Sequence, residues 1–278
     1  MKRRHNGMDG IAAWGHGWRH AVMPSCHHAV RSIIVLTLTV LCTAQFGRQR
    51  EVLCGEDTPE NHRYDGRFTF ARLRFEPSEA ASWGRRGDLK WDHDCPRGER
   101  HFTKILDEVT LVGPYLEGGN IFDLDDPELF RHPIAYMCEP GFWSQTDKQA
   151  ASFRAYLLKG GFAIFDDFRE YDWANFEEQI RRVLPEGRLV RLEAGNAVFD
   201  SFFRLKTIYF QQMYDSSPPI YYGVYEDNDP NKWLLLIANY NNDISEYWEF
   251  SDEGDVPIEL SNEAYKLGVD YVIYGMTH

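Results

Sequence analysis

Two adjacent aspartates, Asp166 and Asp167, end the apolar stretch GGFAIFDDF at residues 160–168. A pair of carboxylates can act in acid–base catalysis, bind a divalent cation, or accept hydrogen bonds from nearby backbone amides. Successive side chains of a strand point to opposite sides, so we expect only one of the two to line a ligand crevice. We favour a structural role, in which the carboxylates cap backbone amides or hold a loop in place. Contact with a ligand or metal and acid–base catalysis remain alternatives.

Polar residues also follow the other predicted strands. In an open parallel sheet, ligands bind beyond the carboxyl ends of the strands. Glu139, Glu193 and Asn239 stand at such ends, and Tyr240 with the loop 241–243 comes directly after the last of them. A cation held by the aspartate pair would need further oxygen ligands, which Glu139 or Glu193 could supply. The candidate crevice is therefore acidic, and a divalent cation is the cofactor it could take.

The densest group of potential metal ligands is Trp91-Asp92-His93-Asp94-Cys95. Zinc binds histidine, cysteine and carboxylate, but its ligands usually come in pairs at loop or helical spacing, and adjacent side chains rarely converge on one ion. We therefore favour a polar loop in which Trp91 is packed and Asp94 turns the chain. The metal alternative combines Asp94 with Asp166 and Asp167.

The hydrophobic pattern places these residues on alternating strands and helices. That alternation predicts an α/β fold, a three-layer α/β/α sandwich with a mainly parallel sheet. The predicted strands cover 68–75, 133–138, 162–165, 188–193, 221–226 and 233–239, and the predicted helices cover 98–109, 172–183, 262–276 and the stretch from Ser144 or Thr146 to Gly160.

The N-terminal residues have the features of a secretory signal. Residues 33–41 form an apolar run too short to span ~30 Å of hydrocarbon, and Cys42-Thr43-Ala44 suits a signal peptidase. The leader is long, and a start at Met23 would give it normal proportions. We therefore expect a secreted or periplasmic protein with no membrane span in the mature chain. The predicted parts are a signal peptide over 1–44, a flexible tether over 45–66 and a single domain over 67–278.

The charge of the chain excludes one class of partner. There are 30 basic and 43 acidic residues, which gives a net charge of −13. Removing residues 1–44 takes away five basic residues and one acidic residue, which leaves 25 against 42 and a net charge of −17. Such a surface repels phosphate backbones and anionic lipid. We therefore expect no nucleic-acid partner.

Three cysteines remain after the leader, Cys54, Cys95 and Cys138. Export permits a disulfide, but three well-spaced cysteines do not form a disulfide framework. A disulfide between Cys54 and Cys95 remains an alternative. We favour the other expectation, that the thiols are buried or inert.

The last third of the chain is rich in aromatic residues. Ring faces stack on sugars while carboxylates accept hydrogen bonds from hydroxyls, so an acidic, exported domain of this kind invites a carbohydrate-binding hypothesis. The other interpretation places Tyr221 and Trp233 in core strands, which would account for most of the rings. We favour the core interpretation.

Several blocks of the sequence resemble domain-of-unknown-function family 4159. They are LDDPELFRHPIAYM at 124–137, LLKGGFAIFDD at 157–167, RRVLPEGRLVRL at 181–192 and KLGVDYVIYGMTH at 266–278. The resemblance covers roughly residues 67–278 and implies a fold of the class I glutamine amidotransferase-like, flavodoxin-like type. It implies no activity. A Trp and Asp-Pro segment of the family is similar to the region of Trp91 and Asp94, which nominates both as crevice-lining residues.

The nucleophile of that superfamily is missing. Amidotransferases carry a cysteine within Gly-x-Cys-x-Gly on a tight turn, and the counterpart here is Phe165-Asp166-Asp167-Phe168. Cys138 does not replace it, because it follows a different strand and Pro140 restricts the backbone where the turn would be needed. The chain also has Glu193-Ala194-Gly195-Asn196 where relatives commonly carry an Asp-His pair. We therefore do not expect glutamine hydrolysis.

The sequence favours an exported, non-catalytic module that binds a small ligand or a protein partner at the acidic crevice. Relatives are often fused to, or neighboured by, von Willebrand-type domains, so the resemblance also implies partners in an envelope assembly. The alternatives are a metal-assisted hydrolase that uses strand-end carboxylates and a carbohydrate-binding protein.

Overall fold

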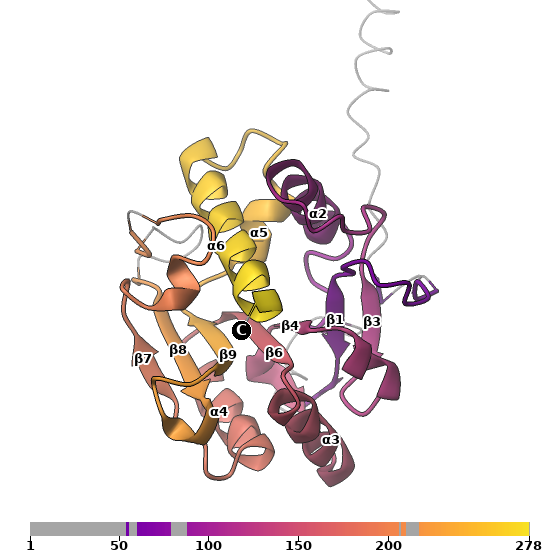
Figure 1. The fold of residues 1–278 in the computed structure, drawn as a ribbon, viewed down its shortest axis with the longest axis vertical. Helices are drawn as coiled ribbons and strands as arrows, with labels where there is room; N and C mark the ends of the chain where they lie inside the picture. The colour runs from indigo at the N-terminus through magenta and orange to yellow at the C-terminus, as the bar shows by residue number, and fades with distance from the viewer. Residues whose placement is uncertain (1–53, 56–59, 79–87, 206, 210–216, 278) are drawn as a thin grey trace, which may run out of the picture. The chain divides into compact units, whose positions relative to one another are not determined.

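A computed structural model describes residues 54–55, 60–78, 88–205, 207–209 and 217–277 (Figure 1). The chain divides into two units, Met1–Glu51 and Val52–His278, and all of the described residues belong to the second. The predicted signal peptide over 1–44 lies outside the described residues. Among the described residues, no helix has both the length and the apolar character that crossing a membrane requires.

A seven-stranded sheet forms the centre of the domain. Five neighbouring strands run parallel in the order β3-β1-β4-β6-β9, and β8 is antiparallel to both β9 and β7. The prediction of an α/β fold with a mainly parallel sheet is confirmed. The strands are β1 Ala71–Arg74, β3 Asn120–Asp123, β4 Ile134–Cys138, β6 Phe162–Phe168, β7 Val190–Leu192, β8 Ile220–Tyr225 and β9 Leu234–Tyr240.

The direction of β8 follows from the length of its connection to β9. A parallel pair needs a crossover of a dozen or more residues, usually through a helix. Only the turn 226–233, with the short 3-10 helix η5 Glu226–Asn228, separates β8 from β9, so the two strands pair as a hairpin. A separate two-stranded ribbon joins β2 Glu76–Pro77 to β5 Trp143–Ser144.

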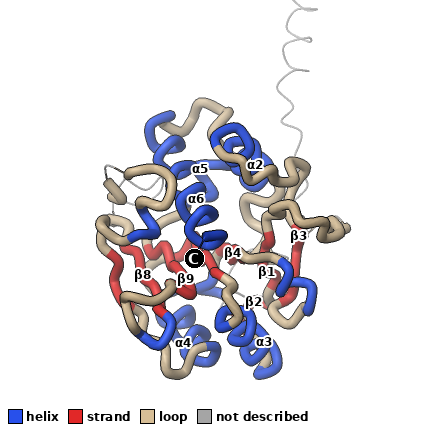
Figure 2. Tube along the Cα trace, in the orientation of Figure 1, coloured by secondary structure: helices blue, strands red, loops and turns tan. Residues whose placement is uncertain are grey.

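Helices cover both faces of the sheet (Figure 2). Alternate residues of β4 show why: Ala135 and Met137 join the core beneath α3 and α4, whereas Tyr136 and Cys138 join the core beneath α2, α5 and α6. The helices are α2 Arg97–Val109, α3 Asp147–Leu158, α4 Asp172–Val183, α5 Ile244–Glu249 and α6 Ile258–Thr277, with 3-10 turns η2 Pro127–Arg131, η3 Pro140–Phe142 and η4 Ala197–Phe199.

The helix α3 begins and ends at residues that the sequence nominated. Thr146 accepts a hydrogen bond from the backbone N–H of Gln149, and the Gln149 side chain accepts one from the backbone N–H of Thr146. Gly160 follows the helix with φ 101°, a left-handed conformation that glycine adopts without strain. Thr146, and not Ser144, is therefore the N-cap.

A buried ion pair holds the loop between β1 and α2. Arg72 and Glu99 are almost fully buried, and Arg72 Nε donates to Glu99 Oε1 at 2.6 Å. Arg72 Nη1 donates to the carbonyl oxygens of Trp91 and His93 at 2.8 and 3.0 Å. One guanidinium on β1 thus fixes the backbone of the loop that carries Asp94.

The same loop is tied to the start of the domain by a disulfide between Cys54 and Cys95. The expectation of inert thiols is wrong for this pair and holds only for Cys138, which is free and fully buried. The disulfide brings residue 54 beside the start of α2 across a sequence separation of 41, and cysteine spacing alone does not reveal such a long-range contact. Asn61 and His62 also hydrogen bond to β3, so this part of the predicted tether contacts the domain.

Replacing Arg72 with methionine should lower the free energy of unfolding by about 3–5 kcal/mol, because Glu99 would be left buried without its partner. The double variant R72M/E99M should recover part of that loss, since neither charge remains. Urea unfolding followed by circular dichroism measures both values. A double variant no more stable than R72M would show that the pair does not act as a unit.

Candidate functional site

Four loops meet at the carboxyl edge of the sheet, where β1, β4, β6 and β9 end side by side. They contribute the residue stretches 88–96, 139–142, 167–171 and 241–243. Carboxylates on these loops, at the end of β6 and on α5 form one group, defined here as the acidic edge. Its members are Asp94, Glu139, Asp166, Asp167, Asp243, Glu246 and Glu249.

Asp166 occupies the interior of the acidic edge and is fully buried. Its Oδ1 accepts a hydrogen bond from Asn239 Nδ2 at 2.9 Å. Its Oδ2 accepts from the Tyr136 hydroxyl at 3.0 Å and from the backbone N–H groups of Ile244 and Ser245 at 2.9 and 3.2 Å. Four protein donors therefore use this carboxylate, which joins β4, β6, β9 and the start of α5.

Asp167 does not point to the opposite face of the sheet, as strand alternation predicts. The residue has φ 55°, and the pairing of β6 with β9 shifts between Phe165 and Phe168. Its Oδ2 lies 3.9 Å from the sulfur of Cys138, and its Oδ1 accepts from Arg169 at 2.9 Å. The left-handed turn breaks the alternation and keeps Asp167 on the same edge as Asp166.

Asp94 lies at the centre of the group. Its Oδ2 accepts a hydrogen bond from Ser245 Oγ at 2.5 Å and lies 3.8 Å from the sulfur of Cys138. The side chain of Glu249 also hydrogen bonds to Asp94. Asp94 thus contacts a hydroxyl and a second acid.

Three residues place carboxylate oxygens within 4.8 Å of one another: Asp94, Asp243 and Glu246. Asp243 precedes α5, and its Oδ1 accepts from the backbone N–H of Glu246 at 3.0 Å. Neither Asp94 nor Asp243 has an ion-pair partner in the described part of the chain. This set, defined here as the oxygen triad, has a geometry that a hard divalent cation could occupy.

A second set, His93, Glu139 and Asp167, is already neutralised by cations. His93 Nδ1 contacts Glu139 at 2.5 Å, Lys90 Nζ lies 3.1 Å from the same carboxylate, and Arg169 pairs with Asp167. Burial opposes protonation of His93, but its hydrogen bonds to Glu139 and Asp88 outweigh burial and raise its pKa to about 10. These contacts make the set an internal ion-pair network.

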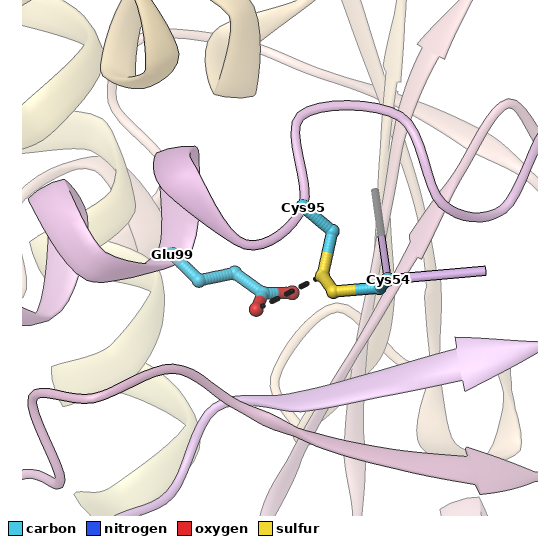
Figure 3. A group of neighbouring side chains, drawn as sticks. All are labelled: Cys54, Cys95 and Glu99. Carbon is cyan, nitrogen blue, oxygen red and sulfur yellow. Dashed lines mark hydrogen bonds between the residues drawn. A yellow bond between two sulfur atoms is a disulfide. The ribbon is translucent and has the colours of Figure 1, made fainter. Parts of the chain in front are cut away.

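The third set is closed by the disulfide. Figure 3 shows Cys54, Cys95 and Glu99 together, with a carboxylate oxygen of Glu99 at 3.3 Å from the sulfur of Cys95. Metals bind cysteine as a thiolate. Because Cys54 and Cys95 are joined in a disulfide, neither sulfur can form one. The oxygen triad is therefore the best candidate for a cation among the described residues.

The acids of the edge resist ionisation. Burial raises the pKa of Asp166 to about 6, although hydrogen bonds from Asn239 and Tyr136 lower it. Burial, followed by the charges of neighbouring carboxylates, raises the pKa of Asp167 and of Asp243 well above the usual value. The same causes raise the pKa of Glu249 to about 8. The ionised form of these acids is thus disfavoured at the edge, chiefly by burial.

Backbone strain concentrates at the same edge. Among the described residues other than glycine, eight have a positive φ, and six of these lie in the loops of the acidic edge. Strained conformations of this kind persist where the surrounding structure over-determines them and often mark functional sites. The six are Lys90, Asp94, Glu139, Asp167, Glu170 and Asn241.

The remaining candidates from the sequence have other surroundings. Glu193 is exposed beside Arg191 and Tyr209, three strands away from Asp166. Trp91 is buried in the core, and Tyr240 packs its ring against Trp173.

Sequence reasoning missed Ser245, Glu246 and Glu249, because the helix that carries them, α5, has only six residues. A signal was present, since aspartate followed three residues later by glutamate, as in Asp243 and Glu246, is typical of a helix start. The loop 241–243 was expected to border the crevice, but the helix after it was not predicted.

Comparison with known proteins identifies the family of this chain but does not indicate an activity. The family model described as Domain of unknown function (DUF4159) matches residues 69–276. No curated protein matches the chain.

Asp166→Asn should lower the free energy of unfolding by about 2–3 kcal/mol, because an amide nitrogen would replace one acceptor and leave buried N–H groups of α5 unsatisfied. Asp167→Asn should cost less, since its ion-pair partner Arg169 is partly exposed. Chemical denaturation of both variants, with Asp107→Asn on the exposed face of α2 as the control, measures the difference. A larger loss for Asp167→Asn would contradict the structural role of Asp166.

The pH dependence of stability follows from the raised pKa values. A carboxyl whose pKa is raised by folding contributes stability that is complete below the unfolded value and is lost as pH rises through the folded value. The pKa values of about 6 for Asp166 and about 8 for Glu249 place this loss between about pH 4 and pH 8. Each pKa unit corresponds to about 1.4 kcal/mol.

Urea unfolding at several pH values, in buffer with a chelator and without divalent cations, should therefore give a free energy of unfolding that falls over this range. The variant D243N should show a shallower fall, because one of the repelling charges is gone. A free energy that rises with pH over the same range would contradict the assignment.

Proposed function

Because this chain belongs to the DUF4159 family, whose function is unknown, we propose from its geometry that it is an exported, non-catalytic binding module that takes a divalent cation at the acidic edge. The observation that carries the proposal is the oxygen triad of Asp94, Asp243 and Glu246, whose oxygens lie within 4.8 Å of one another. A cation there would offset both causes that raise the pKa of Asp243, the burial of its carboxyl and the charges of the neighbouring carboxylates.

The chemistry of the donors favours a hard ion. Carboxylate oxygens suit Ca²⁺, Mg²⁺ and Mn²⁺, whereas zinc prefers nitrogen and sulfur ligands. Cys138 is the one free thiol of the described residues and lies 3.8 Å from Asp94, but burial raises its pKa well above the usual value, which opposes the thiolate form. We therefore propose Ca²⁺ as the physiological ion, in keeping with an exported protein.

The proposed fold supports the location of the cation site at the carboxyl ends of the parallel strands. The parallel strands, numbered among themselves along the chain, have the order 2-1-3-4-5, which is that of flavodoxin-like folds. In such folds the ligand site lies at the carboxyl ends beside the reversal of strand order, which here falls between β1 and β4. The loop with Asp94 follows β1, and Glu139 follows β4. The glutamine amidotransferase-like relationship is part of this proposal.

The proposed setting is outside the cytoplasm, with a cleavable signal over residues 1–44 and partners in the cell envelope. A disulfide between Cys54 and Cys95 is compatible with an oxidising compartment. A cation would let a module of strongly negative charge accept the carboxylate or hydroxyl groups of a ligand or of a protein partner.

One observation favours a second function, a metal-assisted hydrolase. Asp94, Glu139 and Asp167 all hold left-handed backbone conformations, which are frequent at catalytic sites. Calcium-loaded protein that hydrolyses p-nitrophenyl esters or phosphates would support this function if Asp94→Asn removed the turnover. The carbohydrate alternative has less support, because Tyr221, Tyr247 and Trp248 are buried in the core.

Calorimetric titration of the purified chain with CaCl₂ tests the proposal. Binding should be saturable and should stabilise the fold by ~2.7 kcal/mol at a free concentration one hundred times the dissociation constant. Asp243→Asn is the most direct variant, because asparagine keeps the helix cap while the charge is lost. It should weaken Ca²⁺ binding about tenfold or more, since one of three carboxylate ligands is removed.

Glu246→Gln should act in the same direction, and Asp107→Asn, on an exposed face of α2, should bind like the wild type. If neither Ca²⁺ nor Mn²⁺ binds, or if the double variant D243N/E246Q binds as well as the wild type, the proposed cation site is wrong.

A further inference from the structure

A cavity lies at the edge of the sheet opposite to the acidic edge, where β6 and β9 begin. It has a volume of about 100 Å³ and is lined by the ends of α3 and α6 and by the turn between β8 and β9. β6 has seven residues, so this cavity is about 20 Å from the acidic edge. The residues that define its character are Leu158, Phe162, Glu226, Trp233, Leu235 and Tyr274.

Trp233 is the unusual residue of this cavity. The sequence indicates a core position for it, but β9 begins one residue later, at Leu234, and the Trp233 residue is 51% exposed. Leu158, across the cavity, is 50% exposed. The expectation of a buried Trp233 is therefore wrong, and a large indole lines an open cavity.

Glu226 gives the cavity its charge. This residue is half-buried, and its carboxylate accepts no hydrogen bond from a described residue. The turn 226–232 holds three carboxylates and a single ammonium, that of Lys232, which is paired with Asp227. The electrostatic character of the opening is thus negative.

We infer that this cavity binds a small organic cation, an alkylated ammonium group. Aromatic faces, Trp above all, attract such cations, and aliphatic walls accommodate their methyl groups. A metal ion would need several oxygen ligands, and the side chains of the lining supply only the Glu226 carboxylate and the Tyr274 hydroxyl. An anion would be repelled by Glu226.

The size of the cavity is consistent with a head group only. Drug-sized ligands occupy about 300–1,000 Å³, which is several times the volume available. A trimethylammonium group, placed against the Trp233 indole with its charge toward Glu226, satisfies the three features of the cavity: its size, its apolar walls and its negative charge.

Choline chloride is the probe, and 3,3-dimethyl-1-butanol, which has the same shape without the charge, is its matched control. In calorimetric titrations of the full chain, choline should bind saturably at millimolar concentrations and the neutral analogue should not. Trp233→Leu should weaken choline binding by roughly 3- to 30-fold, the range expected for loss of a cation–π contact. Trp233→Phe should lose less, because it keeps an aromatic face.

Glu226→Gln should also weaken binding, whereas Tyr171→Leu, which removes an exposed ring at the start of α4, should not. Thermal unfolding confirms that each variant is folded. Equal binding of the neutral analogue, unchanged affinity in Trp233→Leu, or no binding of choline would overturn the inference. Competition by phosphatidylcholine vesicles would identify a lipid head group as the source of the ammonium, and its absence a free small molecule.

Discussion

The buried carboxylate of Asp166 is the interaction on which the carboxyl edge of this domain depends. Its two oxygens accept hydrogen bonds from Tyr136 on β4, from Asn239 on β9 and from the first two N–H groups of α5. Asn239 in turn accepts from Tyr271 on α6. A single charge without access to solvent therefore connects three strands and two helices, and it fixes where α5 begins.

The position of α5 decides which acids can meet. Ser245, whose N–H donates to Asp166, turns its hydroxyl to Asp94, and Asp243 and Glu246 come from the same turn. The loop that brings Asp94 is held by Arg72, Glu99 and the disulfide at Cys95. Two rigid supports thus bring carboxylates from distant parts of the chain together. Burial of these acids, with the charges of their neighbours, raises the pKa of Asp243 and of Glu249.

The sequence predicted the parts of this fold that a hydrophobic pattern determines. β4, β6, β9 and the helices α3 and α4 fall near their predicted positions, because each has a long apolar face. β3 was missed because only four residues, Asn120–Asp123, form it. The orientation of Asp167, the exposure of Trp233 and the pairing of Cys54 with Cys95 depend on single φ angles, on strand ends and on long-range contacts, which a local pattern does not contain.

A crystal structure of the protein grown with CaCl₂, with an anomalous difference map, is the most direct test of the cation site. The account predicts a single strong peak at the oxygen triad, about 2.3–2.6 Å from carboxylate oxygens of Asp94, Asp243 and Glu246. A map without a peak there, or with the peak between His93, Glu139 and Asp167, would contradict it.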